Sequence, residues 1–285
     1  MKTFLITGAS GFLGSHLVDK LVLVDGVRVI SAIMPEEVST YSVRSQEEVV
    51  LNDAIFAGNL SPIDVVINCA FARSNDAGQL ASALDFTASL IRGLKKIEIG
   101  GVINISSQGV YKRLPVGELA TEDTLIEPVD LYSMSKYAAE KMFLLSDLES
   151  VTNIRLASLA MKQRFLYAFI RSARETGLIR LNSPGVYASL LDVDDAAEAL
   201  VALSLTPPSQ WRSEYNLSIG AQYSLAEYAE AVKRVGERKG FHIEIVTEDN
   251  GANGTAGTDI SHLKADTGWT PRVTNEMMIE KLFSN

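Results

Sequence analysis

Three glycines near the N-terminus constrain the fold of this chain more than any other feature of its sequence. Gly8, Gly11 and Gly14 follow an apolar run, Lys2–Thr7, and lead into an amphipathic segment, 12–23. A strand that turns sharply into a helix needs a residue without a β-carbon at the turn; further glycines let a pyrophosphate approach and let helix and strand pack closely. The start of the helix then attracts phosphate through its free N–H groups. The pattern predicts a dinucleotide-binding turn, and an ordinary glycine-rich turn is the alternative.

A phenol and an ammonium stand four positions apart in the middle of the chain. Tyr132 and Lys136 fall in segment 131–149, which is rich in good helix formers. Positions i and i+4 share one face of a helix, and a neighbouring ammonium lowers the pKa of a phenol. Tyr132 is therefore a candidate acid or base near neutral pH. Because Tyr-x-x-x-Lys is common by chance, a surface helix without chemistry is the alternative.

A hydroxyl residue ends an apolar strand upstream of this pair. Segment 102–105 is predicted as a strand, and Ser106 and Ser107 follow it. In open parallel sheets, ligands bind at the carboxyl ends of the strands. Ser107 therefore joins Tyr132 and Lys136 as a candidate site residue.

Strands and helices are predicted to alternate along the first two thirds of the chain, which favours a doubly wound parallel α/β sheet of the Rossmann type. The predicted strands are Lys2–Thr7, Val27–Ile33, 49–51, 64–69, 102–105 and 153–159; the predicted helices are 12–23, 79–97, 131–149, 165–176, 194–205 and 224–239. Ser224 and Glu227 form a capping-box pattern at the start of the last helix. We expect residues 1–157 and 186–206 to form the dinucleotide-binding domain, and residues 158–185 and 207–285 a smaller substrate-binding lobe.

At this point the chain resembles an extended short-chain dehydrogenase/reductase of the NAD-dependent epimerase/dehydratase type. In that family a Ser ends a strand about 25 residues before the Tyr of Tyr-x-x-x-Lys, and Ser107 stands 25 residues before Tyr132. The stretch from Ser107 to Tyr111 resembles the family's Ser-x-x-Val-Tyr. Further matching segments follow in order: Asp64 to Ala70, Val193 to Ala197, Tyr215 to Ser218 with Ser224 to Glu227, and Asp259 and Lys264 with Gly268 to Pro271.

The resemblance implies a site and a reaction class. It implies Ser107, Tyr132 and Lys136 as the catalytic residues, with NAD or NADP as the cofactor. The implied cofactor-binding residues are Gly8, Gly11, Phe12, Leu13, Gly14, Cys69, Ala70, Phe71, Tyr132 and Lys136. It also implies a homodimer that pairs through helices 79–97 and 131–149, and a small-molecule substrate that is a nucleotide-activated sugar.

The chain departs from the family in ways that bear on cofactor and reaction. An acid after the second strand is typical of NAD users and a basic residue of NADP users, but Ser31 to Pro35 supply neither. Glu36 and Arg44 lie nearby; the acid would favour NAD and the base would favour NADP, so the cofactor preference stays open. Gln108 and Gly109 stand where dehydratases carry an Asp-Glu pair, and neither can transfer a proton. We therefore do not expect 4,6-dehydration.

Other departures concern the substrate. Ser158 and Leu159 stand where relatives often carry Asn and Pro, and Ala188 stands where they carry an Arg that binds the substrate diphosphate. Other candidates for that contact are Arg164, Arg171, Arg174, Arg180, Arg212 and Arg272. Three functions stay open: a 4-epimerase or 4-ketoreductase acting on a nucleotide sugar, a reductase of a non-sugar carbonyl, and a nucleotide-sensing regulator without turnover.

Bulk properties restrict the partners. A net charge of −9 over 285 residues argues against nucleic acid or an anionic membrane as a main partner. No apolar run approaches the roughly 20 residues of a membrane span, and a strand that starts at residue 2 leaves no room for a signal peptide. The single cysteine, Cys69, excludes an internal disulfide and is expected to be a small buried residue in a reducing, cytoplasmic protein. No spacing of Cys, His and acidic residues indicates a metal site.

Overall fold

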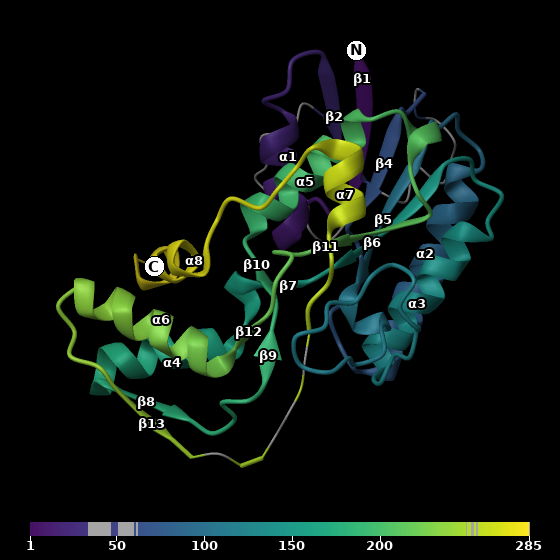
Figure 1. Ribbon diagram of the computed structural model, residues 1–285. Coiled ribbons are helices and arrows are strands. Elements are labelled where there is room, and N and C mark those ends of the chain that lie inside the picture. Colours follow the sequence, from purple (N-terminus) through teal and green to yellow (C-terminus); the bar gives the residue numbers. More distant parts are fainter. Residues whose placement is uncertain are drawn as a thin grey trace.

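A parallel sheet of seven strands forms the centre of the larger part of the protein (Figure 1). The computed structural model describes residues 1–33, 47–50, 60, 62–248, 250–251, 254 and 256–284. The strands are β1 (Lys2–Thr7), β2 (Val27–Ile33), β3 (Glu47–Val50), β4 (Val65–Asn68), β5 (Val102–Ser107), β6 (Val151–Leu156) and β11 (Glu214–Leu217). Their order is β11-β6-β5-β4-β1-β2-β3, and every pairing is parallel. Most of these strands are buried along their length, as expected for a sheet covered on both faces.

Helices cover both faces of this sheet. On one face α1 (Phe12–Leu21) packs against α5 (Val193–Leu205), and their apolar residues share a core with β1, β4 and β6. On the other face α2 (Ala77–Leu94) packs against α3 (Leu131–Leu144). Figure 1 shows the two helix layers on opposite sides of the sheet. The predicted doubly wound α/β fold is confirmed.

The strand order reverses at β1, which lies between β2 and β4. Such a switch point leaves a crevice at the carboxyl ends of the strands, where ligands bind. A row of buried polar side chains fixes the register of the strands just below this edge. Thr7 donates to Asn68 at 2.6 Å, Asn68 donates to Asn104 at 2.9 Å, and Asn104 donates to Asn153 at 2.8 Å. The ends of β1, β4 and β5 are thereby held level with one another.

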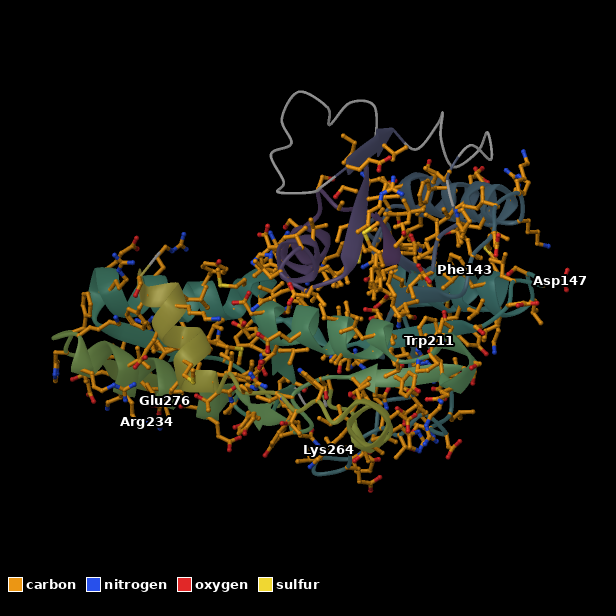
Figure 2. All side chains as sticks on the ribbon, turned by 90° about the horizontal axis from the view of Figure 1, so that it is seen from above. Phe143, Asp147, Trp211, Arg234, Lys264 and Glu276 are labelled. Carbon is orange, nitrogen blue, oxygen red and sulfur yellow. The ribbon has the colours of Figure 1, made fainter. Side chains whose placement is uncertain are left out.

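A second core lies outside the sheet, formed largely by α4 (Arg164–Thr176), α6 (Leu225–Arg238) and α8 (Asn275–Ser284). Two strands pair beside these helices, β8 (Leu178–Leu181) and β13 (Glu244–Thr247). The capping box predicted for α6 is confirmed: Ser224 accepts from the Glu227 amide at 3.1 Å, and the Glu227 carboxylate accepts from the Ser224 amide at 2.7 Å. Figure 2 shows Arg234 of α6 and Glu276 of α8 at the end of the molecule opposite to Phe143.

Short strands connect the two cores. β7 (Ser158–Leu159) pairs with β10 (Leu190–Leu191), and β9 (Tyr187–Ala188) pairs with β12 (Tyr223–Ser224). The strand predicted at 153–159 is thus two strands, because β6 pairs within the central sheet up to Leu156 whereas β7 pairs with β10.

Two segments that we expected in the substrate lobe pack with the sheet instead. β11 extends the sheet beside β6, and α7 (Ser261–Thr267) packs on α5 and β11 with Leu263 in the first core. We therefore propose to keep the division into two lobes but to assign these two segments to the dinucleotide-binding side. Glu36 and Arg44 lie outside the described residues. Among the helices that the structure describes, none combines the length and apolar character needed to cross a bilayer.

Candidate active site

The glycine turn between β1 and α1 is tightly packed. Gly8 has a φ of +65°, and a β-carbon there would lie 2.8 Å from the backbone nitrogen of Ala70. A β-carbon on Gly14 would lie 2.1 Å from the carbonyl oxygen of Gly8. The Gly11 amide closes the turn by donating to the Gly8 carbonyl at 2.9 Å. The turn therefore tolerates a side chain at neither Gly8 nor Gly14.

The first turn of α1 is free to bind an anion. No side chain caps the helix at Gly11, and its first turn contains no acidic residue. Free amides at a helix start, together with the positive end of the helix dipole, form a phosphate site. Ala70 lies directly against Gly8, so the turn after β4 borders the same place. These residues fit a dinucleotide pyrophosphate.

Tyr132 stands at a helix start that two side chains define. The Asp130 carboxylate caps α3 by accepting from the Ser133 amide at 2.8 Å. Asn75 accepts from the Tyr132 amide at 3.0 Å, which ties α3 to the segment before α2. The predicted helix at 131–149 is thus confirmed in its start, and it ends earlier, at Leu144.

Ser107 and Tyr132 open into one cavity. The cavity has a volume of about 380 Å³, and Ser107, Tyr132 and Ser133 line it together with Tyr187 and Thr258 from the C-terminal half. A small molecule in this cavity therefore lies next to both candidate residues. The structure brings these two predicted residues together at the edge of the sheet.

Lys136 lies behind this cavity. Its side chain is buried, its Nζ donates to the carbonyl of Ile105 at 2.7 Å, and its Nζ lies 4.1 Å from the ring centroid of Phe71. Burial lowers the pKa of Lys136 to about 7, against the opposing effects of Cys69 and Glu140. Lys136 therefore loses its proton at a lower pH than an exposed lysine does.

The pKa of Tyr132 differs from the sequence-based expectation. It is raised, mainly by burial and further by Asp130, while the Arg73 charge acts in the opposite direction. Lys136 does not lower it, because its Nζ is directed at Ile105 and lies 6.0 Å from the Tyr132 ring centroid. The role of Tyr132 as acid or base stays a prediction.

A buried ion pair supports α3 from below. Glu140 lies two turns after Tyr132, and Arg155 of β6 donates to its two carboxylate oxygens at 3.0 and 3.2 Å. Ser106 also donates to Glu140, and Arg155 reaches the Tyr111 hydroxyl at 3.0 Å. Since both charges are buried and fully paired, this contact fixes α3 against β5 and β6.

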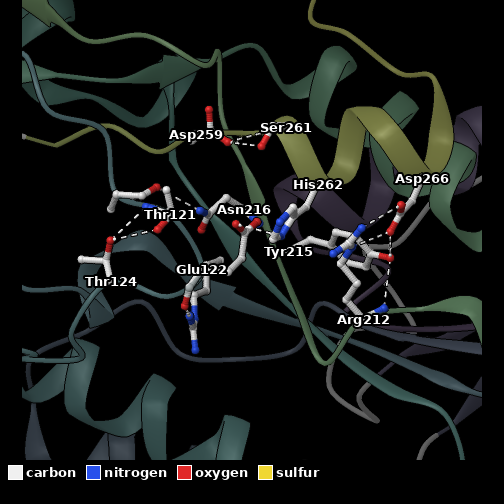
Figure 3. Close-up of polar contacts among 12 residues, drawn as sticks. Thr121, Glu122, Thr124, Arg212, Tyr215, Asn216, Asp259, Ser261, His262 and Asp266 are labelled. Carbon is white, nitrogen blue, oxygen red and sulfur yellow. Dashed lines mark hydrogen bonds and ion pairs between the residues drawn. The ribbon is translucent and has the colours of Figure 1, made fainter.

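Polar contacts continue from this pair to the C-terminal segments (Figure 3). The Tyr111 hydroxyl donates to Asn216 at 2.7 Å, and the Asn216 amide donates to the Glu122 carboxylate at 2.8 Å. His262 of α7 lies 3.3 Å from Glu122. The segment after Ser107 is thus held against β11 and α7, and Tyr111 and Asn216 are in contact although they are 105 positions apart in the sequence.

Positions 108 and 109, where dehydratases carry an Asp-Glu pair, are closely packed in this protein. A β-carbon on Gly109 would lie 2.5 Å from the Ser133 hydroxyl oxygen and 3.3 Å from that of Ser107. A larger residue at 109 would therefore displace Ser133. Gln108 also lines the cavity, and its side-chain oxygen is buried with no hydrogen-bond partner within the described part of the chain.

The six arginines considered for a substrate diphosphate do not line this cavity. Arg212 pairs with Asp266 at 2.8 Å, and Arg272 and Arg180 lie 3.9 Å from Glu198 and Glu248. The cations that do line the cavity are Lys112 and Arg113, which the sequence analysis missed. Their position directly after Tyr111 was the available signal.

The residues after β4 pack between the glycine turn and α3. Burial raises the pKa of the Cys69 thiol to about 12, although the Lys136 charge acts in the opposite direction. Cys69 is therefore a neutral thiol that packs against the first core. The Phe71 ring stands edge-on to Tyr132, with 6.3 Å between centroids. Within the ranges given above, no group of three or more His, Cys, Asp or Glu side chains is placed to hold a metal ion.

Fold and site together define a nucleotide-binding α/β protein with a Ser–Tyr–Lys set at the sheet edge. The model of the NAD dependent epimerase/dehydratase family matches residues 4–218, so the chain belongs to this family. The resemblance to extended short-chain dehydrogenase/reductase enzymes is thereby confirmed. No protein of curated function matches the sequence.

Several solved structures share the fold over nearly the whole chain. A UDP-N-acetylglucosamine 4-epimerase from Bacillus cereus matches with a TM-score of 0.77 and 19% identity, covering 100% of this chain and 96% of its own. A UDP-glucuronic acid 4-epimerase from Bacillus cereus, in complex with UDP-glucuronic acid and NAD, matches with a TM-score of 0.80, 19% identity and coverages of 99% and 98%. RMD from Pseudomonas aeruginosa, complexed with NADPH, matches with a TM-score of 0.76, 21% identity and coverages of 100% and 98%.

Proposed function

We propose that this protein is a nicotinamide-dinucleotide-dependent enzyme that oxidises or reduces a carbon of a nucleotide-activated sugar, as a 4-epimerase or a 4-ketoreductase. The observation that carries the proposal is the cavity shared by Ser107 and Tyr132 at the carboxyl edge of the sheet, beside a glycine turn that fits a pyrophosphate. The family supports the cofactor class, and the structural relatives with UDP-sugar substrates support the substrate class.

The chain's own residues have distinct tasks in this proposal. The amides that follow Gly11 bind the pyrophosphate, with Ala70 and Phe71 bordering the dinucleotide. A nicotinamide dinucleotide, when bound, supplies the group that accepts and returns a hydride. Tyr132 transfers a proton to or from the substrate hydroxyl or carbonyl oxygen, and Ser107 donates a hydrogen bond to the same oxygen. Lys136 holds the ribose next to the nicotinamide.

Lys112 and Arg113 are the charged residues suited to an acidic substrate group. Both are exposed cations, and they line the cavity that contains Ser107 and Tyr132. An arginine can bind two phosphate oxygens at once, and a lysine binds phosphate as a point charge. We propose that these two residues bind an acidic group of the substrate in this cavity.

The function is tested by turnover on a panel of UDP- and dTDP-linked sugars and 4-keto sugars, with product stereochemistry read by NMR. Conversion of one sugar to its C4 epimer without net change in NADH absorbance identifies an epimerase. Stoichiometric loss of NADH or NADPH absorbance with a keto sugar identifies a reductase. Reduction of simple carbonyls alone, or binding of nucleotide with no turnover on any substrate, would contradict the proposal in favour of a non-sugar reductase or a sensor.

We also propose a homodimer that pairs through α2 and α3. These helices pack against each other, and α3 exposes Leu131 and Met134, about half exposed at 48% and 51%. Apolar side chains on an exposed helix face are typical of a contact between subunits. Sedimentation equilibrium should give a dimer mass at micromolar concentration, and a monomer mass would contradict this proposal. A cytoplasmic location stays a prediction from the single cysteine.

A further inference from the structure

A second cavity, which shares no lining residue with the cavity of Ser107 and Tyr132, is lined mainly by cations. It has a volume of about 490 Å³, and its lining residues are Arg73, Lys162, Gln163, Arg164 and Phe165. Arg73 follows β4, Lys162 ends the short helix η3 (Ala160–Lys162), and Arg164 begins α4. The three charges thus come from the sheet side and from the second core, and no acidic side chain lines the cavity with them.

This cavity lies between the two ends of the proposed nucleotide site. Lys162 Nζ is 4.5 Å from the ring centroid of Phe12, the first residue of α1 after the glycine turn. At the other end, Arg73 follows Phe71 by two residues, and the Phe71 ring stands 6.3 Å from the Tyr132 ring between centroids. The charge of Arg73 opposes the burial that raises the pKa of the Tyr132 phenol. The cluster of Arg73, Lys162 and Arg164 therefore faces the space between the start of α1 and the candidate catalytic tyrosine.

The charges of this cluster are unpaired. Within the described part of the chain, none of the three forms an ion pair, whereas Arg155, Arg212, Arg234 and Arg238 each contact a carboxylate. All three side chains are exposed, in a protein whose net charge is −9. Three like charges around one cavity repel one another, and an anion bound between them removes that repulsion.

We propose that Arg73, Lys162 and Arg164 bind the diphosphate group of a nucleotide and so connect the two lobes around it. This inference rests on the proposed function, because the location of the cluster is judged relative to Tyr132 and the glycine turn. The diphosphate belongs either to the dinucleotide or to the nucleotide of the substrate, and the chemistry of recognition is the same. Arg73 binds the diphosphate from the sheet side, and Lys162 and Arg164 bind it from the side of the second core.

Calorimetric titration of the purified protein, freed of nucleotide, tests the inference. The probes are ADP-ribose, which carries the dinucleotide's diphosphate, UDP, which carries the substrate's, and adenosine and uridine, which carry none. We expect Lys162→Met and Arg164→Met each to weaken the binding of one diphosphate probe by about tenfold, while the binding of adenosine and uridine is unchanged. Lys162→Arg keeps the charge and should retain most of the affinity. Arg174→Met, on an exposed site of α4 outside this cavity, is the matched control.

Each outcome is decisive. Weakening confined to ADP-ribose assigns the cluster to the dinucleotide, and weakening confined to UDP assigns it to the substrate. Unchanged affinity for both probes in Lys162→Met and Arg164→Met, with a wild-type protein that binds them, would overturn the inference and leave the proposed function intact. A folded wild-type protein that binds neither ADP-ribose nor a nicotinamide dinucleotide would instead contradict the proposed function.

Discussion

The ammonium of Lys136 is fixed by the carbonyl of Ile105, 2.7 Å away, so that α3 and β5 are joined directly beneath the candidate active site. Ile105 stands two residues before Ser107, and Lys136 one helical turn after Tyr132. This hydrogen bond therefore helps, together with the Glu140–Arg155 pair, to fix Tyr132 relative to Ser107. It also holds the ammonium in a buried place, where burial lowers its pKa.

This buried lysine predicts a pH-dependent stability. The pKa of Lys136 is about 7 in the folded protein and near 10.5 in the unfolded chain. Between these values the unfolded chain binds more protons, so the contribution of Lys136 to folding becomes more favourable as pH rises, and its penalty is largest below pH 7. The free energy of unfolding of Lys136→Met, measured relative to that of wild type, should therefore be higher at pH 6.5 than at pH 9. Urea denaturation of nucleotide-free protein measures this, with Lys141→Met as an exposed control on the same helix. An equal difference in the free energy of unfolding at both pH values would show that folding does not lower the pKa of Lys136.

Removal of the Tyr132 hydroxyl should stop the chemistry without removing the cofactor. Proton transfer by a positioned side chain contributes about 10²–10⁴-fold to rate, so Tyr132→Phe should lower kcat by that range while the Kd for NADH or NADPH changes little. Tyr137→Phe removes a hydroxyl from the same helix, outside the 380 Å³ cavity, and serves as control. Rapid-mixing kinetics and fluorescence titration separate the two effects. A fully active Tyr132→Phe protein would reject the assigned role.

A single methyl group should disrupt the glycine turn. The β-carbon of Gly14→Ala would lie 2.1 Å from the Gly8 carbonyl, so the turn or the start of α1 must move. We expect a loss of about 1–3 kcal/mol in the free energy of unfolding and a large loss of nucleotide affinity. Gly78→Ala in α2 would meet only the Asp76 carboxylate that caps this helix, at 3.3 Å, and should have little effect on nucleotide affinity. Nucleotide affinity unchanged in Gly14→Ala would show that the turn is not the binding site.

The buried Glu140–Arg155 pair should dominate the stability of the site. Removal of one partner leaves an uncompensated buried charge, so Glu140→Gln should lower the free energy of unfolding by about 3–5 kcal/mol. Glu198→Gln removes the partner of Lys20 in a half-exposed pair and should cost less than about 1 kcal/mol. Chemical denaturation of both variants gives the comparison. Equal losses would mean that the Arg155 charge finds another partner when Glu140 is replaced.

Features with local causes were predictable from the sequence. The glycine turn, the strand that ends at Ser107 and the capping box at Ser224 each depend on a few neighbouring residues, whose backbone requirements are specific. Ser107 was predicted at the ligand-binding edge because a parallel sheet brings the carboxyl ends of its strands there. It was grouped with Tyr132 because the spacing of 25 residues resembles that of the family. The structure places both in one cavity, as expected.

Features that depend on distant partners were not predictable. β11 joins the sheet because its four residues pair with β6, about 60 positions earlier in the chain, and a strand this short gives no clear pattern. The side chain of Lys136 was expected to face Tyr132, but a backbone carbonyl 31 residues away accepts its hydrogen bond. Lys112 and Arg113 stand directly after Tyr111, which was a usable signal, but the residues that face them across the cavity, such as Tyr187 and Thr258, come from the C-terminal half.

The most direct test of the central claim is the identification of the nucleotide that this protein binds. Mass spectrometry of the small molecules released on denaturation, followed by titration of the emptied protein with NADH and NADPH, covers both retained and exchangeable cofactor. We predict one nicotinamide dinucleotide per chain, bound either before purification or on titration, and lost in Gly14→Ala. A folded protein that releases no nicotinamide nucleotide and binds neither NADH nor NADPH would contradict the account.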